Sequence, residues 1–423
     1  MEKNYNNIVK GLAVVAVLGL VAYIYQLYSG LIVTNMRNPF SWGLYVATWA
    51  FYVGTAAGGL VVSSAIYLFN ARQLKPIARV AALTAFLFAM GAMIILLPDI
   101  GRPDRLYNMI IHPNFKSMLP WDFIVLSSYA VVSAIYTYTL MYPDIAAKGV
   151  KLPFYGVVGR KELTEEGLAR LREESAKKAK RLAPVALPLA ILIHTVTAWV
   201  LATQFARSWW YGGVLAPTFI SAALATGPAI VILASLVVFG YKDKMEGTYM
   251  LLAKVSAVSA IIMLFMYYND FMIRFWWHNG RDFDALKLVF TKYIFLHAVE
   301  VIFILLSAYI FIKYPKDPKK LVQGSLSVIV GVFAHRFLLL PPAYNIIPLR
   351  VPVIMHNETV EWSYPIAVGQ IRGNLNNPEK VFVAYWSYVP SIVEIAVTAG
   401  VMAFLVLAFL KLVQILPVKE VEQ

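Results

Sequence analysis

Long apolar runs, separated by shorter polar connections, fill most of the chain. A membrane-spanning helix needs about 20 largely apolar residues, and these runs are too uniformly apolar for the alternating strands of a membrane barrel. Ten runs qualify, and they cover residues 10–32, 43–69, 76–97, 121–142, 183–205, 214–239, 249–270, 290–312, 321–340 and 386–410. The pattern predicts an all-α polytopic membrane protein in which residues 1–423 form one integral membrane domain.

Composition supports this class and narrows the chemistry. Of the 423 residues, 60% are hydrophobic and 14% are charged, and the mean hydropathy is +0.67. Soluble domains are about 45–50% apolar and about 25% charged, so the composition argues against a soluble and against a disordered chain. The sequence has no cysteine, which excludes a disulfide, a thiolate nucleophile and a cysteine-ligated iron–sulfur cluster in this chain.

Charge predicts how the chain is oriented. Lys and Arg are more numerous on the side that holds both termini, mainly because the connection 143–182 contributes ten of them. The positive-inside rule therefore places both termini in the cytoplasm and the protein in the cell membrane. The first run lacks a small-residue cleavage site after it, and we interpret it as a retained helix. The net charge is +14, but basic and aromatic residues are not interleaved along the sequence. We therefore expect the basic residues to contact lipid headgroups and not nucleic acid.

Two connections are long. Residues 143–182 contain a stretch with acidic residues first and basic residues last, which predicts an amphipathic helix on the cytoplasmic side. This helix would lie at the lipid headgroups, or would dock a cytoplasmic partner. Residues 341–385 are rich in proline, asparagine and aromatics and are expected outside the cytoplasm. A connection of that length is often functional, so it would cover a site or receive a partner subunit.

The sequence contains a faint internal repeat. The second and sixth runs share small residues in their middle at an offset of about 170, and Asp99 and Asp270 end the third and seventh runs. The fifth and ninth runs each carry a histidine, His194 and His335. The repeat predicts two four-helix bundles, formed by runs 2–5 and 6–9, with single helices outside them.

Ionisable residues inside spanning helices are costly, so each one is a candidate for function. Here they lie near the middle of the membrane or in its non-cytoplasmic half. The set comprises Asp99, Asp122, His194, Tyr267, Asp270, Arg274, His297, Glu300, His335, Arg336 and Glu394. Each has a structural alternative, such as a helix cap, a contact between helices or, for the arginines, snorkelling to the interface. Trp209, Trp210, Trp276 and Trp277 are most simply interpreted as an interfacial aromatic belt.

Three chemistries would use such a set. A quinone head needs hydrogen-bond donors at its carbonyls and two protons in a full cycle, which histidine, tyrosine, arginine and carboxyl groups supply. A proton path needs a chain of carboxylates or histidines. A b-type haem needs axial histidines, and three histidines on three helices are present.

Several motifs resemble those of the polysulfide reductase/NrfD-like integral membrane subunits. Within this family, the ten-helix branch, which includes the HybB-type, DsrP-type and alternative complex III subunits, resembles this sequence most. The matching stretches run from about residue 38 to 402, and most of the connection 143–182 is left out. They are PFSWGLYVATWAFYVGTAAGG, LLPDIGRPDRLYN, HPNFKSMLPWD, HTVTAWVLATQFARSWWYGGVLAPTFISAALATG, HAVEVIF, GVFAHRF and YVPSIVEIAVTAG.

The resemblance implies a quinone site near the non-cytoplasmic surface, a menaquinone-type quinone, and no haem or iron–sulfur cluster in this chain. An iron–sulfur, ferredoxin-like subunit would dock there, with a larger catalytic subunit of molybdenum-enzyme or hydrogenase type beyond it. Two departures from the family pattern are His335, where relatives often have asparagine, and the looser match around Asp270.

We therefore expect the quinone-reactive membrane subunit of a respiratory oxidoreductase complex, and proton transfer is a further role that this site would allow. The alternatives are a proton or ion channel or transporter, and a dihaem cytochrome anchor. Residues are assigned as follows: quinone binding and proton exchange to His194, Asp99, Arg102, Asp270 and Tyr267; proton-path candidates Glu300, His297, Glu394 and Asp122; partner docking or loop structure to Arg105 and Arg336.

Overall fold

Among the residues that the structure describes, ten helices are long and apolar enough to cross a membrane. A computed structural model describes residues 2–37, 40–152, 156–204, 207, 209–278, 280–345, 350–355, 358–363 and 388–419. The long helices are α1 (Glu2–Ser29), α2 (Leu44–Leu68), α3 (Ala78–Ile100), α5 (Met118–Lys148), α6 (Glu165–Ala202), α7 (Leu215–Phe239), α8 (Glu246–Trp277), α10 (Ile294–Lys313), α11 (Pro318–Leu338) and α14 (Ile392–Ile415). The predicted all-α polytopic fold is confirmed.

Short elements connect these helices. They are the helices α4 (Asn108–Ile111), α9 (Gly280–Phe290) and α12 (Pro341–Asn345), the hairpin β1 (Val150–Leu152) with β2 (Gly156–Val158), and the hairpin β3 (Arg350–Met355) with β4 (Glu358–Ser363). In the antiparallel pairs, Val150 lies opposite Val158 and Arg350 lies opposite Ser363. The start of the predicted tenth run and much of the connection 341–385 lie outside the described residues.

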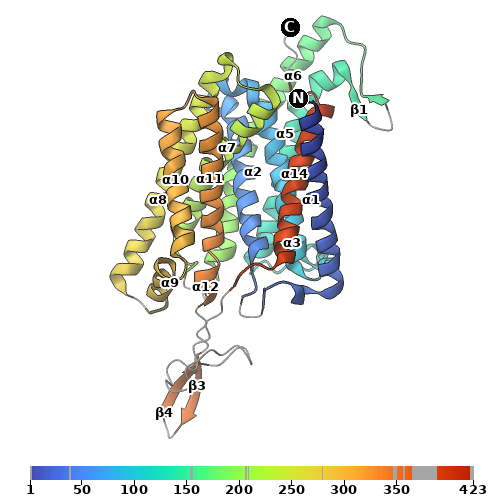
Figure 1. Ribbon diagram of the computed structural model, residues 1–423. Coiled ribbons are helices and arrows are strands. Elements are labelled where there is room, and N and C mark those ends of the chain that lie inside the picture. Colours follow the sequence, from blue (N-terminus) through green and yellow to red (C-terminus); the bar gives the residue numbers. More distant parts are fainter. Residues whose placement is uncertain are drawn as a thin grey trace.

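The helices form two groups that share one interface. Helices α2, α3, α5 and α6 contact one another in a ring, as do α7, α8, α10 and α11, and α2 packs on α7 between the rings. Helices α1 and α14 pair with each other beside α3 (Figure 1). The two rings match the two predicted bundles, whereas the sequence repeat itself stays a prediction.

The joint between the rings depends on two glycines. A Cβ atom on Gly58 of α2 would collide with the backbone of Gly227 of α7, and one on Gly227 would collide with Gly58. Small residues let membrane helices approach until their backbones touch. The small-residue middles of these two helices, which the sequence shows, are therefore the surface that joins the rings.

The two ends of the bundle differ, and Figure 1 identifies them. Helix α1 begins and α14 ends at one end, hereafter the terminal end, and α9 and α12 lie at the opposite end, hereafter the α9 end. Apolar side chains on the outer faces of the long helices are exposed, among them Val17 and Leu18 of α1 and Ile261 and Phe265 of α8. This is the surface expected against lipid chains.

One helix differs from the sequence prediction in its length. The predicted amphipathic helix and the fifth span form a single helix, α6, although it contains Pro184 and Pro188. Thr164 caps its first turn, because its hydroxyl accepts a hydrogen bond from the Gly167 N–H at 3.2 Å. Proline is tolerated inside a helix when neighbouring helices support the backbone, and α5 packs along α6.

Candidate functional site

Glu300 of α10 lies at the centre of the second ring and is fully buried. Its two carboxylate oxygens pair with two histidines, His297 Nδ1 at 2.9 Å and His335 Nδ1 of α11 at 2.7 Å. The Nε2 atom of His297 is 2.9 Å from the hydroxyl of Tyr268. The spacing of three residues between His297 and Glu300 places both on one face of α10, and the packing of α11 on that face supplies His335.

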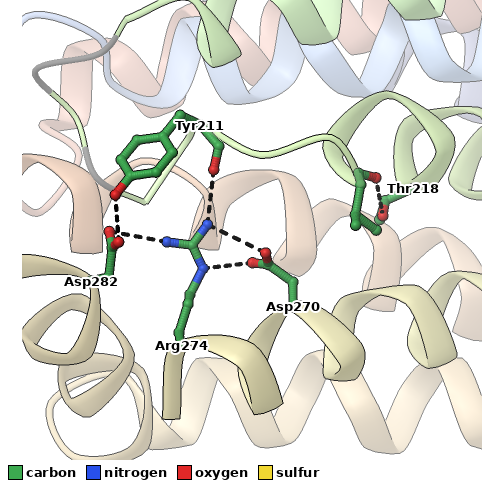
Figure 2. Close-up of polar contacts among 6 residues, drawn as sticks. Tyr211, Thr218, Asp270, Arg274 and Asp282 are labelled. Atoms are coloured by element: carbon green, nitrogen blue, oxygen red, sulfur yellow. Dashed lines mark hydrogen bonds and ion pairs between the residues drawn. The ribbon is translucent and has the colours of Figure 1, made fainter. Parts of the chain in front are cut away.

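A buried arginine lies toward the α9 end. Figure 2 shows Arg274 of α8 between two carboxylates, with Asp270 Oδ2 at 2.7 Å and Asp282 Oδ1 of α9 at 3.2 Å. The same guanidinium donates a hydrogen bond to the Tyr211 carbonyl at 3.0 Å, and the Tyr211 hydroxyl donates to Asp282. Arg274 is only 7% exposed, so it does not snorkel to the surface. Burial, together with the hydrogen bond to Asp282, raises the pKa of Tyr211 to about 12.

A small cavity separates Arg274 from the Glu300 group. Its walls include Trp209, Tyr267, Asp270, Arg274 and His335, and its volume, measured as the space open to water centres, is about 20 Å³. Tyr267 stacks edge-on against the His335 ring, with 4.6 Å between ring centroids. The predicted stripe of Tyr267, Asp270 and Arg274 therefore faces one cavity. Tyr268, Asp282 and Tyr211 were not predicted, because their partners come from separate helices and connections.

His194 of α6 lies in the first ring, against α2. Its Nδ1 atom is 3.1 Å from the Ala190 carbonyl, and its Nε2 atom is buried with no hydrogen-bond partner among the described residues. Arg336 of α11 lies nearby and is 1% exposed, so it does not snorkel either. Its Nη2 atom donates to the Phe219 carbonyl at 3.3 Å, and its guanidinium lies 3.6 Å from the Phe219 ring centroid.

Asp122 belongs to the same part of the first ring. It is buried on α5, and its Oδ1 atom accepts a hydrogen bond from the Thr197 hydroxyl of α6 at 2.6 Å. Thr197 follows His194 by three residues, so Asp122 is fixed against the helix face that carries His194.

His297 uses both ring nitrogens for hydrogen bonds within the protein, which leaves neither free as a haem ligand.

Asp99 ends α3 at the α9 end of the first ring. Its Oδ1 atom is buried and has no partner among the described residues. Gln26 of α1 connects Pro98, the residue before Asp99, to α2. Its amide N–H donates to the Pro98 carbonyl at 2.7 Å, and its side-chain carbonyl accepts from the Tyr45 hydroxyl at 2.6 Å. Tyr45 and Gly54 lie on opposite faces of α2, and the described residues show no direct contact between Asp99 and His194.

Glu394 at the start of α14 has a structural role that its motif explains. The sequence Ser391-x-x-Glu394 forms a capping box, in which each side chain bonds to the backbone of the other residue. Glu394 also accepts hydrogen bonds from the Asn35 N–H at 2.9 Å and from the Tyr388 hydroxyl. Burial and the neighbouring carboxylate raise the pKa of Tyr388. Glu394 thus ties α14 to the segment that follows α1.

Arg102 and Arg105 lie in the short connection that follows α3. Arg102 forms a two-pronged pair with Asp104, at 2.9 and 2.7 Å, and both side chains are mostly exposed. The Arg102 guanidinium lowers the pKa of Asp104 through this hydrogen bond, and Asp104 raises that of Arg102. Arg102 is therefore exposed, unlike His194 and Tyr267, the buried residues with which the sequence analysis grouped it. Arg105 is exposed in the same turn.

The aromatic residues divide into two groups. Trp276 and Trp277 are exposed, as an interfacial belt requires. Trp209 and Trp210 are buried, and the belt interpretation is wrong for them. Trp210 donates to the Leu339 carbonyl at 2.7 Å, and Trp209 lies in the cavity wall with the Arg274 guanidinium 5.2 Å from its ring centroid. Their partners lie on other helices, so sequence alone does not separate them from the belt.

Ten spans with buried ionisable groups in two helical rings define a polytopic helical membrane protein. A family model described as "Polysulphide reductase, NrfD" matches residues 32–348, and the chain belongs to this family. The resemblance identified from the sequence motifs is therefore confirmed.

Relatives carry the names of subunits of several reductases and oxidoreductases. The chain is 37% identical to a putative membrane subunit of dimethyl sulfoxide reductase from Halobacterium salinarum, over 53% of this chain and 50% of that relative. It is 23% identical to a selenate reductase subunit of Mesobacillus selenatarsenatis, over 97% and 95% of the two chains. It is 24% identical to an Hdr-like menaquinol oxidoreductase integral membrane subunit of Archaeoglobus fulgidus, over 97% and 94%.

Proposed function

We propose that this chain is the quinone-interacting membrane subunit of a respiratory oxidoreductase complex. Membership of the NrfD family and the similarity to a menaquinol oxidoreductase subunit support the proposal. One structural observation carries it further. Asp99 has a buried carboxylate oxygen without a partner among the described residues, and this residue directly follows Pro98, which lines an apolar groove.

The groove has the properties that an isoprenoid tail requires. It lies between α1, α3 and α14, has a volume of about 500 Å³, and is lined almost entirely by apolar side chains. Its wall includes Tyr23, Leu97, Pro98 and Val401, so it runs along the bundle as far as the residue that precedes Asp99. A quinone with its tail in this groove would bring its ring to the Asp99 carboxyl, which would orient the ring or exchange a proton with it.

His194 is the second candidate for hydrogen bonding to the quinone. Its buried Nε2 atom, which has no partner among the described residues, can bond a quinone carbonyl or a quinol hydroxyl. The described residues show no direct contact between Asp99 and His194, so the two residues would serve two separate quinone-binding positions. Replacement of either residue is therefore expected to lower quinone-linked turnover, and a variant with normal turnover would remove its residue from the quinone path.

The remaining parts of the proposal concern orientation and partners. The chain lies in the cell membrane with both termini in the cytoplasm, and the α9 end faces the outside. There an iron–sulfur, ferredoxin-like subunit docks and exchanges electrons with a menaquinone-type quinone, and the enzyme is completed by a larger subunit of molybdenum or hydrogenase type. Arg102 and Arg105 are exposed at this end and are suited to electrostatic docking.

Two neighbouring residues of α14 allow a matched test. Val401 lines the groove beside α1 and α3, whereas Met402 lines a second apolar groove between α2, α10 and α11. In the assembled complex, Val401→Trp and Asp99→Asn are expected to reduce quinone-linked turnover by about tenfold or more, and Met402→Trp is expected to leave it nearly unchanged. Loss of turnover in Met402→Trp with normal turnover in Val401→Trp would overturn the placement in the first groove. Normal quinone-linked turnover in all three variants would overturn quinone binding at both grooves.

A further inference from the structure

The small cavity at Trp209, Tyr267 and His335 holds three polar atoms that have no hydrogen-bond partner among the described residues. These atoms are Trp209 Nε1, Tyr267 Oη and His335 Nε2. The three residues are 4%, 6% and 0% exposed, respectively. A buried polar group without a partner costs about 1–3 kcal/mol. Three such groups around one cavity indicate that something polar fills it.

The donor and acceptor roles of these atoms follow from their known contacts. Glu300 accepts hydrogen bonds through both carboxylate oxygens, so His335 carries its hydrogen on Nδ1 when the imidazole is neutral. Its Nε2 atom is then an acceptor that needs a donor. Trp209 Nε1 is a donor only, and the Tyr267 hydroxyl is a donor with spare acceptor capacity. Asp270, also in the wall, is an acceptor.

One water molecule satisfies this arrangement completely. It would accept hydrogen bonds from Trp209 and Tyr267 and donate its two hydrogens to His335 Nε2 and to the Asp270 carboxylate. The cavity offers about 20 Å³ to the centres of water molecules, which admits a water whose own volume is that of one probe sphere, about 10–15 Å³.

The same reasoning accounts for the other histidine of the group. His297 also donates from Nδ1 to Glu300, and its Nε2 atom is beside the Tyr268 hydroxyl, which serves as its donor. Both histidines thus have the same hydrogen-bonding need, and a tyrosine meets it at His297. At His335 the protein offers a cavity in place of a side chain.

We propose that this cavity binds one structural water molecule, which links the Glu300 group to Asp270 and the α9 end. The resulting chain runs from Asp270 through the water and His335 to Glu300. A proton delivered to His335 Nε2 from the water is matched by release of the Nδ1 proton to Glu300, so charge reaches Glu300 without movement of a heavy atom. On the opposite side of Glu300, toward the terminal end, the next residue of α10 on the same face is the apolar Ile304. Glu300 therefore exchanges protons with the α9 end.

High-resolution cryo-electron microscopy of the full complex tests the site directly. The expected result is a density peak within hydrogen-bonding distance of His335 Nε2, Tyr267 Oη and Trp209 Nε1. An empty cavity, in a map that resolves other buried waters, would overturn the proposal. A His335 ring turned so that Nε2 bonds directly to Tyr267 or Trp209 would overturn it as well. The proposal does not depend on quinone binding.

Hydrogen exchange in two variants tests the direction of the link. Val214→Leu adds bulk to the cavity wall without changing a polar group. The control, Ser307→Ala, removes a buried hydroxyl of α10 on the terminal side of Glu300. Infrared spectra of the complex after transfer to D₂O, with the Glu300 and His335 signals assigned by substitution, give the exchange rate. We expect at least tenfold slower exchange in Val214→Leu and no change in Ser307→Ala. The reverse pattern, or equal rates in wild type and both variants, would show that protons reach Glu300 by another route.

Discussion

His194 and Arg336 approach the same glycine of α2 from two different rings of helices. A Cβ atom placed on Gly54 would lie 3.9 Å from His194 Nε2 and 3.8 Å from Arg336 Nη2. Both side chains are buried, and His194 Nε2 and the Nε and Nη1 atoms of Arg336 have no hydrogen-bond partner among the described residues. The joint between the rings therefore holds a histidine and a guanidinium with unused hydrogen-bonding capacity, separated by a position that carries no side chain.

Replacement of His194 tests its role toward the quinone. In the assembled complex we expect His194→Ala to lower quinone-linked turnover by about 10²-fold, the typical contribution of a positioned acid or base. Transfer of electrons between the partner subunits and artificial acceptors should be unaffected, which distinguishes a quinone defect from loss of assembly. Unchanged quinone-linked turnover in His194→Ala would contradict the assignment of this residue.

The glycine contact between the rings predicts a sharp contrast between two alanine variants. Gly58→Ala forces a Cβ atom into the backbone of Gly227, and the helices must separate. Gly54→Ala places its Cβ at ordinary contact distances. We expect Gly58→Ala to lower the yield of folded protein and its midpoint of thermal unfolding, and Gly54→Ala to fold normally. Equal thermal stability of the two variants would show that the rings tolerate separation.

Replacement of Glu300 by glutamine is expected to lower the free energy of unfolding through its hydrogen bonds to the two histidines. Glu300→Gln replaces one acceptor oxygen by an NH₂ group that faces a histidine N–H, so one hydrogen bond is lost and two donors oppose each other. A loss of about 1–3 kcal/mol in the free energy of unfolding is expected.

The matched control for Glu300→Gln is Glu246→Gln. Glu246 pairs with Lys316 at 2.7 Å on the exposed surface, where such pairs contribute about 0–1 kcal/mol. Thermal unfolding in the same detergent compares the two variants. Similar losses in both would mean that the histidine contacts of Glu300 do not contribute to stability.

The sequence predicts the spans well because the signal for them is local. Each apolar run of sufficient length becomes a helix, and polar residues three or four apart share a face. This rule anticipated the grouping of Tyr267, Asp270 and Arg274 and that of His297 with Glu300. The capping box at Ser391 and Glu394 is equally local, and its motif is readable in the sequence.

Contacts between distant segments set the limit of sequence prediction. The pairing of His335 with Glu300 depends on how α11 is rotated against α10, and both helices are apolar on nearly all sides. Asp282 contacts Arg274 because α9 packs against α8. The buried positions Ala285, Leu286 and Val289 recur at helical spacing along α9, but this pattern does not identify the helix that α9 contacts. For the same reason Asp99 and His194, which the sequence analysis assigned to one site, show no direct contact among the described residues: Pro98, which precedes Asp99, connects through Gln26 to Tyr45, whereas His194 faces Gly54.

The exposed Arg102 predicts a docking effect without a stability effect. Its pair with Asp104 is open to solvent, and such pairs contribute little to stability. We expect Arg102→Glu to leave thermal unfolding unchanged and to reduce the amount of partner protein that copurifies at low salt. The difference from wild type should shrink as the salt concentration rises, because salt screens the electrostatic contribution of exposed charges. Full recovery of the partner from Arg102→Glu membranes at low salt would exclude this residue from docking.

Replacement of Arg274 by lysine is expected to lower stability, in contrast to replacement of Arg102. Arg274 is buried, and its guanidinium forms hydrogen bonds in several directions. The guanidinium bonds Asp270, Asp282 and the Tyr211 carbonyl in different directions (Figure 2). A lysine ammonium keeps the charge and is a point donor that cannot replace this fork. Breaking a buried ion pair costs about 3–5 kcal/mol, and we expect Arg274→Lys to lose a large part of that amount. The conservative change Arg102→Lys, at an exposed pair, serves as the control and should leave the midpoint of thermal unfolding unchanged. If Arg274→Lys unfolds at the wild-type temperature, charge alone stabilises the α9 end, and the fork geometry is dispensable.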